Sequence, residues 1–317
     1  MVKRKGFTLI ELLVVIAIIA VLATLVIGAT MRFITSQKET NTRIIIQNLD
    51  TALQRQWQKV IADAKKETPS QAAYTMAGGD SSRAQVIWIK FRLMEAFPMT
   101  YAECNVATNP LYTNNYIPVG SRKYIAGYQN KLKAGGTVVL VNNIDTQSAA
   151  CLLIALSVNK ALDPDSIASN LGQEILPNGT PQNQYIIDGW GNPVLFFRFP
   201  TPDLTTWSGL GGMDPQSNNP AKSTALGSGV GADPADPEGK LQNPNWNNGG
   251  AGVSSFESIC HPVHTAAGPF AWYITPVIAS AGSDRQAGLT ANFSISNATQ
   301  AGDNIYNYLL RFGATGN

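Results

Sequence analysis

The sequence predicts an α+β protein in which one long N-terminal α-helix packs on a small antiparallel β-sheet, with long connecting loops. No proline occurs before Pro69, so the N-terminal region can form one continuous helix. Short β-branched and aromatic runs in the second half, separated by Gly, Asn and Pro turns, predict short strands. Residues 201–254 are rich in Gly, Pro, Asn and Ser, which predicts a loop insertion in the globular part.

The first part of the helix has the character of a membrane anchor. Residues 12–30 carry no charge, and at about 1.5 Å rise per residue they can cross a hydrocarbon core of roughly 30 Å. Lys3, Arg4 and Lys5 precede the apolar run and predict that this flank stays in the cytoplasm. Glu11 is the exception within the run. Because a carboxylate deep in a bilayer costs about 2.5–3.5 kcal/mol, Glu11 is expected to have a cationic partner.

Cleavage of the chain between Gly6 and Phe7 would create such a partner. The new α-amino group of Phe7 would stand four residues before Glu11, on the same face of the helix. The ion pair can form within one chain or between neighbouring chains. In the second case the charge is neutralised only by packing into an assembly.

Residues 5–27, beginning Lys-Gly-Phe-Thr-Leu-Ile-Glu, resemble the class III signal of type IV pilins and type II secretion pseudopilins. The resemblance implies that prepilin peptidase cuts after Gly6, that Phe7 becomes N-methylated, and that Glu11 is the assembly carboxylate. It also implies a single-pass inner-membrane protein with a periplasmic head, and a filament after assembly. The implied partners are membrane lipid, other pilin or pseudopilin subunits and the inner-membrane assembly platform.

Two simpler interpretations explain less of this segment. A cleaved secretory signal usually has an apolar core of about 7–15 residues, which is shorter than the run here. A plain uncleaved anchor would explain the length of the run but not the spacing of Gly6, Phe7 and Glu11.

The predicted organisation is a leader peptide (1–6), a transmembrane and assembly helix (7–30), an amphipathic stem helix (31–68) and a head (69–317) that contains the insertion 201–254. In the stem, apolar residues recur at steps of three and four and predict a buried stripe, made of Ile46, Leu49, Leu53, Trp57, Val60 and Ala64. Pro69 supplies the stop.

The head is predicted to alternate short elements with polar connections. In order, these are a polar connection 69–83, a helix 85–97, irregular surface 98–136, a strand 137–141, a helix 148–158, a short helix from the cap Asp163 to about Leu171, a strand–turn–strand unit 185–199, strands 270–275 and 277–279 near a sheet edge because of Pro276, and a last strand 305–312.

The turn of the strand–turn–strand unit resembles the Asp-Pro-Trp-Gly-Asn-Pro turn of major pseudopilins. It is formed by Asp188, Trp190, Gly191, Asn192 and Pro193. A catalytic role for Asp188 is the alternative. No companion base is near it in the sequence, so we expect a structural turn.

The segment from Ser280 to Asp303 resembles the C-terminal calcium-binding loop of major pseudopilins. The resemblance implies Ser280, Asp284 and Asp303 as ligands. Calcium takes six to eight oxygen ligands, yet Arg285 follows Asp284 and no further acid occurs before Asp303. The alternative is a loop that keeps this shape without an ion.

Three cysteines, Cys104, Cys151 and Cys260, allow one disulfide and one free thiol in three possible pairings. The sequence does not choose between them. His261 and His264 follow Cys260, but no second Cys/His cluster completes a metal site, so an ordinary loop is expected there.

The composition argues against two other classes of function. The formal net charge is +2 with no basic cluster interleaved with aromatic residues, so nucleic-acid binding is not indicated. No G-x-S-x-G, H-E-x-x-H or phosphate-binding glycine loop is present, so an enzyme is not expected.

The predicted function is therefore a structural subunit of a type IV pilus or a type II secretion-like filament. The bulky head favours a minor subunit near the tip, whereas Glu11 favours a place in the filament body. The alternative function is a membrane-tethered binding module that uses the signal only for export.

Overall fold

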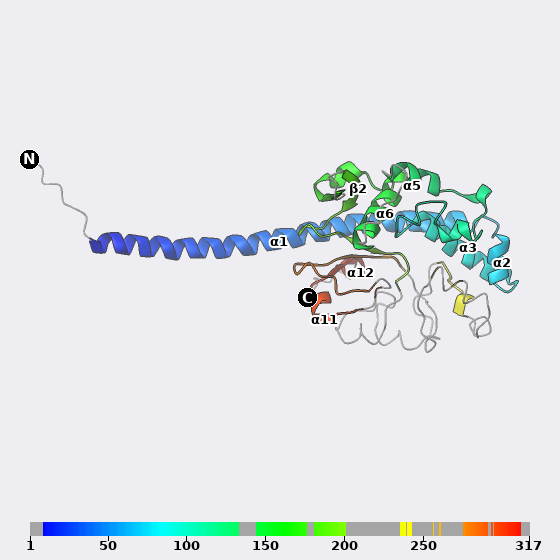
Figure 1. Ribbon diagram of the computed structural model, residues 1–317. Helices are drawn as coiled ribbons and strands as arrows, with labels where there is room; N and C mark the ends of the chain where they lie inside the picture. The colour runs from blue at the N-terminus through cyan, green and yellow to red at the C-terminus, as the bar shows by residue number, and fades with distance from the viewer. Residues whose placement is uncertain are drawn as a thin grey trace, which may run out of the picture.

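The computed structural model describes residues 9–132, 144–175, 181–200, 235–238, 240–242, 256, 260, 275–290, 293 and 295–311. Helix α1 (Leu9–Ala64) is a single continuous helix. Its N-terminal half projects away from the head, and its C-terminal half runs through the head (Figure 1). The predicted long helix is confirmed, and with it the α+β fold class.

The head contains short helices and two small antiparallel sheets. The α-helices are α2 (Gln71–Met76), α3 (Ser81–Ala96), α4 (Pro110–Thr113), α5 (Ile125–Lys131), α6 (Ile144–Val158), α11 (Ala298–Ala301) and α12 (Asn307–Arg311), and the 3₁₀ helices are η1 (Val119–Ser121), η2 (Pro164–Asn170) and η3 (Lys240–Gln242). The strands are β1 (Leu171–Ile175), β2 (Pro181–Ile186), β3 (Leu195–Phe197), β4 (Val277–Ser280) and β5 (Ile305–Tyr306).

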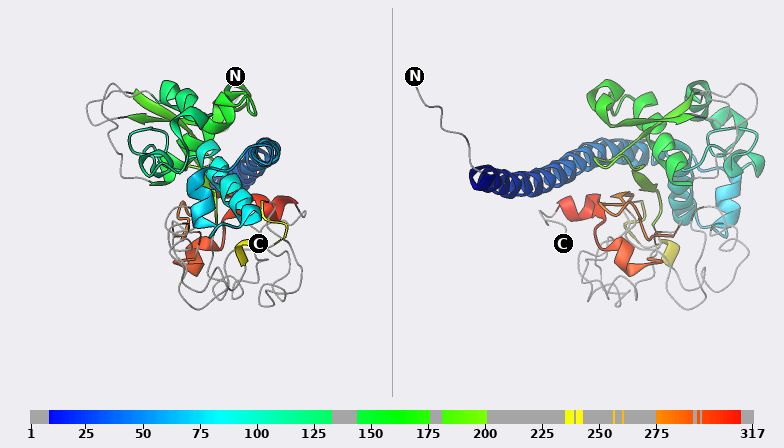
Figure 2. Two further views of the ribbon diagram at one scale, coloured as in Figure 1. Left: turned by 90° about the vertical axis from the view of Figure 1, so that its right-hand side faces the viewer. Right: turned by 60° about the vertical axis from the view of Figure 1, so that its left-hand side comes forward.

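Helix α1 passes between two parts of the head. Helices α5 and α6 and the β1–β2 sheet lie on one side of it, and α12 with the C-terminal segments lies on the other (Figures 1 and 2). Helix α6 contacts both β2 and β3, so it joins the two sheets. Because parts of the head lie on two sides of α1, the buried face of the helix includes Ile45, Ala52 and Ile61 as well as the predicted stripe.

The three-stranded sheet has the order β3–β4–β5 and buries both of its faces. Leu195 pairs with Ala279, and Ala279 pairs with Tyr306. These three side chains belong to a small cluster on one face, whereas Phe196, Ile278 and Ile305 belong to the main core on the other. Side chains alternate between the faces of a strand, so burial on both faces explains why these runs are continuously apolar.

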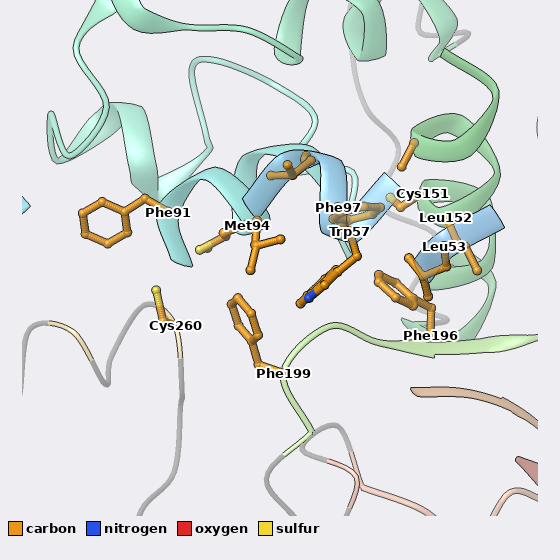
Figure 3. Packing of buried hydrophobic residues seen from close by; sticks show 14 of the residues in the cluster. Leu53, Trp57, Phe91, Met94, Phe97, Cys151, Leu152, Phe196, Phe199 and Cys260 are labelled. Atoms are coloured by element: carbon orange, nitrogen blue, oxygen red, sulfur yellow. The ribbon is translucent and has the colours of Figure 1, made fainter. Parts of the chain in front are cut away.

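The main core centres on the stem half of α1. All six residues of the predicted stripe are buried there, which confirms the stripe. Trp57 lies 5.1 Å from Phe97 and 6.0 Å from Phe199, measured between ring centroids (Figure 3). Rings at such distances add to the free energy gained by burial of their apolar surface.

Several predicted elements of the head are also confirmed. Helix α3 ends before Pro98, and α6 buries Cys151 as expected. Asp163 caps the short helix η2, since its side chain accepts a hydrogen bond from the amide of Asp165.

Two stretches that were predicted to be polar or irregular are more ordered than expected. The connection 69–83 contains α2, which Ser70 caps by accepting from the Ala73 amide at 3.2 Å. The segment 98–136 was predicted to be irregular surface, yet its described part contains α4, η1 and α5. Tyr101 and Tyr128 in this segment are completely or almost completely buried. The prediction was wrong because isolated aromatic residues among Asn and Gly show no periodicity, and only the tertiary fold covers them.

The predicted strand–turn–strand unit is confirmed, since β2 and β3 flank the turn and an isolated antiparallel bridge joins Ile187 and Pro193 across it. Strand β2 otherwise pairs with β1, and β3 pairs with β4. Two other strand assignments are corrected. Strand β4 is the central strand of the three-stranded sheet and not an edge strand. A central position is possible because Pro276 stands just before β4 and removes no hydrogen bond from the sheet. The last strand covers only Ile305–Tyr306, and the chain then turns into α12.

Some predicted features lie outside the described residues. These are the leader 1–6 with Phe7, the strand 137–141, residues 270–274 of the strand before Pro276, both histidines, and all but a few residues of the insertion 201–254.

Candidate functional site

The projecting half of α1 presents apolar side chains around its whole circumference. Leu9 is 81% exposed, Ile27 is 59% exposed and Ile34 is 43% exposed. This half belongs to α1, which is the one helix among the described residues that is long and apolar enough to cross a membrane. In water such a surface would be strongly unfavourable, since each square ångström of apolar area costs about 25 cal/mol. The projecting half is therefore built for lipid or for other protein chains.

The hydroxyl groups of three threonines in this half donate hydrogen bonds to backbone carbonyls of the same helix. Thr24 donates to the Val21 carbonyl at 2.8 Å, Thr30 to the Val26 carbonyl at 2.8 Å, and Thr35 to the Met31 carbonyl at 3.1 Å. Such bonds need no water and no partner chain. The polar atoms of these three side chains consequently add little to the cost of placing the helix in an apolar environment.

Glu11 lies in the first described turn of α1, exposed among the apolar residues. A carboxylate in the first turn of a helix is stabilised by the helix dipole. Gly6 and Phe7 lie outside the described residues. The pairing of the Phe7 ammonium with Glu11 therefore stays a prediction.

Asp188 holds the predicted turn together and joins it to the C-terminal sheet. Its Oδ1 accepts from the amides of Trp190 and Asn192 at 2.8 and 2.9 Å. Its Oδ2 accepts from the Ser280 hydroxyl at 2.6 Å and from the Asn192 side chain at 3.3 Å. The carboxylate is buried, with the residue 2% exposed. Asp188 is thus placed as a structural hydrogen-bond acceptor, and the sequence did not predict that it meets Ser280.

The same turn contacts α1 directly. The Gly189 amide donates to the Thr42 hydroxyl at 2.9 Å, and Thr42 donates in turn to the Lys38 carbonyl at 2.8 Å. A Cβ atom on Gly189 would lie only 2.3 Å from the Lys38 carbonyl oxygen, so only glycine fits here. Lys38 and Thr42 mark where the head begins to cover α1. The contact between Gly189 and Thr42 was not predicted, because a threonine on a helix does not indicate which distant residue it will bind.

A second polar contact attaches the C-terminal segment to α1. Asn307 donates to Asp50 Oδ1 at 2.7 Å, and its own side-chain oxygen accepts from the Ile278 amide at 3.0 Å. Asp50 belongs to α1, Ile278 to β4 and Asn307 to α12. The contact fixes the three-stranded sheet against the stem.

Two of the three predicted calcium ligands, Asp284 and Asp303, meet in a turn, whereas the Ser280 hydroxyl donates to Asp188. Asp303 Oδ2 accepts from the Ser283 amide at 2.7 Å and from the Asp284 amide at 3.0 Å. Gly282 has φ +68°, and a Cβ there would lie 2.4 Å from the Asp303 carbonyl oxygen, which explains the glycine. In the part of the chain that the structure describes, no three Asp, Glu, His or Cys side chains group to hold an ion. Calcium binding at Ser280, Asp284 and Asp303 stays a prediction.

Comparison with known proteins decides the nature of the N-terminal segment. Residues 1–27 match the prokaryotic N-terminal methylation motif. The chain carries a prepilin-type signal. The motif indicates a type IV pilin-like prepilin substrate, which implies processing by prepilin peptidase and assembly with other pilins. No match to the chain was found among curated proteins or among solved structures.

The prepilin signal covers the N-terminal segment alone, and the pseudopilin-like character of the C-terminal half is not confirmed by a relative. The signal and the single apolar helix are consistent with anchoring in the inner membrane. The motif also supports a structural protein more than an enzyme.

At the far end of the stem, a carboxylate fixes the end of α1 to α3. Glu67 accepts at Oε2 from Trp88 Nε1 at 3.1 Å and from Arg92 Nε at 2.7 Å, and Lys123 donates to Oε1. Partial burial of Glu67 acts to raise its pKa, but the hydrogen bond from Lys123 and the charge of Arg92 outweigh it and hold the pKa below its usual value.

Arg92 also pairs with Glu95, whose side chain is completely buried, at 2.6 Å. Glu95 Oε1 accepts from the Tyr112 hydroxyl at 2.9 Å and from the Lys123 amide at 2.7 Å. The sequence analysis did not predict this cluster. The available signal was the presence of Arg92 and Glu95 within the largely buried helix α3, because buried charged residues need partners.

We expect the protein to lose stability in acid through Glu67. Its pKa is depressed in the folded state, so its contribution is present above the ordinary pKa of a glutamate, roughly 4.3, and is lost as the pH falls through the folded value. The thermal midpoint of the full chain in detergent micelles should therefore decrease as the pH is lowered below about 4.3. Glu67→Gln should lower the midpoint at neutral pH and flatten its pH dependence.

Glu238→Gln is the control for this measurement, because Glu238 is exposed and pairs with Lys240 at 3.1 Å on the surface. Its pH profile should match that of the parent protein. An unchanged slope in Glu67→Gln would contradict the role assigned to Glu67.

Proposed function

We propose that the protein is a structural subunit of a type IV pilus or a type II secretion-like filament, assembled through the N-terminal half of α1. The observation that carries the proposal is the division of one continuous helix into two halves. The half with residues 9–37 has exposed side chains, apart from two that are not described, while residues from Thr42 onward bury one face in the head. The exposed half carries the prepilin-type signal.

The exposed half is apolar enough to be stored in the inner membrane before assembly. Moving this helix from lipid into contact with other subunits exchanges one apolar environment for another, so the hydrophobic effect favours neither state strongly. The ion pair of Glu11 with the Phe7 ammonium of a neighbour would then select the packed state and fix its register. The head would lie in the periplasm, and the inner-membrane assembly platform would supply the work of extrusion.

The proposal is supported by the attachment of the head. The hydrogen bonds of Gly189 with Thr42 and of Asn307 with Asp50 fix the head along the stem, and the side chains described in residues 9–37 are exposed. A helix held rigidly at one end and bare at the other can pack beside copies of itself while the heads remain outside the filament core.

Site-specific cross-linking tests this function. A photoreactive amino acid in place of Ile16 or Ile19 should give a ladder of multimers in cells that contain a prepilin peptidase and an assembly platform. The same amino acid in place of Lys131, exposed on α5 and remote from the apolar half, should give mainly monomers. Monomers from every position would overturn the filament and favour the tethered binding module.

A further inference from the structure

Two of the three cysteines face each other inside the head. Cys104 lies in the turn-rich segment before α4, and Cys151 lies on α6. Their Sγ atoms are 3.8 Å apart, and both residues are completely buried. The sulfur atoms would need to approach by about 1.8 Å to reach the roughly 2.05 Å of a disulfide, a shift that side-chain rotation can supply.

The segment that carries Cys104 is fixed against α6. The Tyr101 amide donates to Gln147 Oε1 of α6 at 3.3 Å. Asn109 Nδ2 donates to the Glu103 carbonyl at 2.5 Å, and the Glu103 carboxylate makes two bonds with Arg198, at 2.7 and 3.0 Å. Contacts before and after Cys104 therefore hold its sulfur opposite Cys151.

The third cysteine is placed elsewhere in the core. Figure 3 shows Cys260 facing Phe91 and Met94, at the opposite end of the cluster from Cys151. The sequence allowed three pairings, and the structure favours one of them.

We propose that Cys104 and Cys151 form a disulfide in the exported protein and that Cys260 remains a thiol. The inference rests on the proposed function in one respect, which is that the head lies on the oxidising side of the membrane. The two thiols lose two protons and two electrons as the S–S bond forms. The electrons reduce the disulfide of an exported dithiol oxidase to two thiols.

The bond should form while the head folds. Burial raises the pKa of the Cys151 thiol well above its usual value, so the reactive thiolate is scarce once the head is closed. Neither sulfur is then accessible to an oxidising enzyme. The cross-link joins residues 47 positions apart, which restricts the unfolded chain considerably.

Thiol counting tests the inference. The full chain is extracted from cell membranes, denatured in excess alkylating reagent and weighed by mass spectrometry. One alkylated thiol is expected, together with a linked peptide pair that contains Cys104 and Cys151. Cys260→Ala should have no free thiol and keep the link, whereas Cys104→Ala should have two free thiols. Reduction of the parent protein should lower its thermal midpoint by roughly 5–10 °C.

A second arm separates this inference from the proposed function. If extracted protein has three thiols, it is refolded in detergent with glutathione disulfide. Formation of the Cys104–Cys151 link would then support the pairing and contradict the exported head. Three thiols after refolding as well would overturn the disulfide, whatever the location of the head.

Discussion

Glu11→Ala is expected to reduce incorporation into filaments at least tenfold while leaving removal of the leader unchanged. The predicted cut lies between Gly6 and Phe7, and Glu11 stands one helical turn further on, so it is not part of the bond expected to be cleaved. A tenfold effect corresponds to about 1.4 kcal/mol. The cost of a carboxylate within a bilayer, about 2.5–3.5 kcal/mol, is larger than this.

The substitution acts on both states of the subunit. Alanine removes the charge that makes storage in lipid unfavourable, so the membrane state becomes more stable. It also removes the predicted partner of the Phe7 ammonium in the proposed filament. Both effects shift the equilibrium in the same direction, away from the filament.

The measurement is the amount of protein in sheared or purified filaments relative to membranes, with the processed and unprocessed bands resolved on a gel. Glu39→Ala is the matched control, since Glu39 lies on the same helix beyond the apolar half and pairs with Arg43 at 2.7 Å. It should assemble normally. Gly6→Leu should remain uncleaved and supplies the reference band. Normal incorporation of Glu11→Ala would contradict the assembly role of this carboxylate.

Asp188→Ala is expected to lower the free energy of unfolding by roughly 3–4 kcal/mol, because several donors lose their acceptor inside the protein. Four hydrogen bonds converge on this buried carboxylate, from two amides of the turn, the Asn192 side chain and the Ser280 hydroxyl. For a chain of this size the loss should appear as a fall in the thermal midpoint of about 6–15 °C.

Graded variants separate the role of Asp188 from a general loss of packing. Ser280→Ala removes one of the four donors and should cost only about 1 kcal/mol. Asp188→Asn keeps an oxygen for the two turn amides and should fall between the two. Asp165→Ala removes an exposed carboxylate and should change the free energy by less than about 0.5 kcal/mol. Near-ultraviolet circular dichroism of the full chain in detergent follows each transition, and equal midpoints for Asp188→Ala and Asp165→Ala would exclude a structural role for the turn.

The parts of the fold that could be predicted are those with a strong local signal. The absence of proline before Pro69, with apolar steps of three and four, fixed the length and the buried stripe of α1. Pro98 predicted the C-terminal end of α3 and the cap at Asp163 predicted the start of η2 in the same way, whereas the start of α3 at Ser81 was not predicted. Helix α5 and the buried Tyr101 gave no such signal, because their burial depends on segments far along the chain.

In the candidate site, too, only residues with a local sequence signal could be predicted. The spacing of Gly6, Phe7 and Glu11 and the resemblance to class III signals predict a cut site and a pair of charges within one turn, and these roles stay predictions. The turn at Asp188 was recognised as a turn, but its partner Ser280 is 92 residues away and its neighbour Thr42 is on α1. Hydrogen bonds between distant residues leave no period or motif in the sequence.

The sequence by itself therefore determined the one long helix, because periodicity, charge and proline placement act over a few residues, and its resemblance to class III signals pointed to the prepilin-type signal on that helix. Only the tertiary structure decided that α1 passes between two parts of the head, that Pro276 precedes a central strand, and that Cys104 faces Cys151. Each of these depends on which surfaces the folded chain buries against each other. That choice is made by the packing of the whole core, not by any single segment.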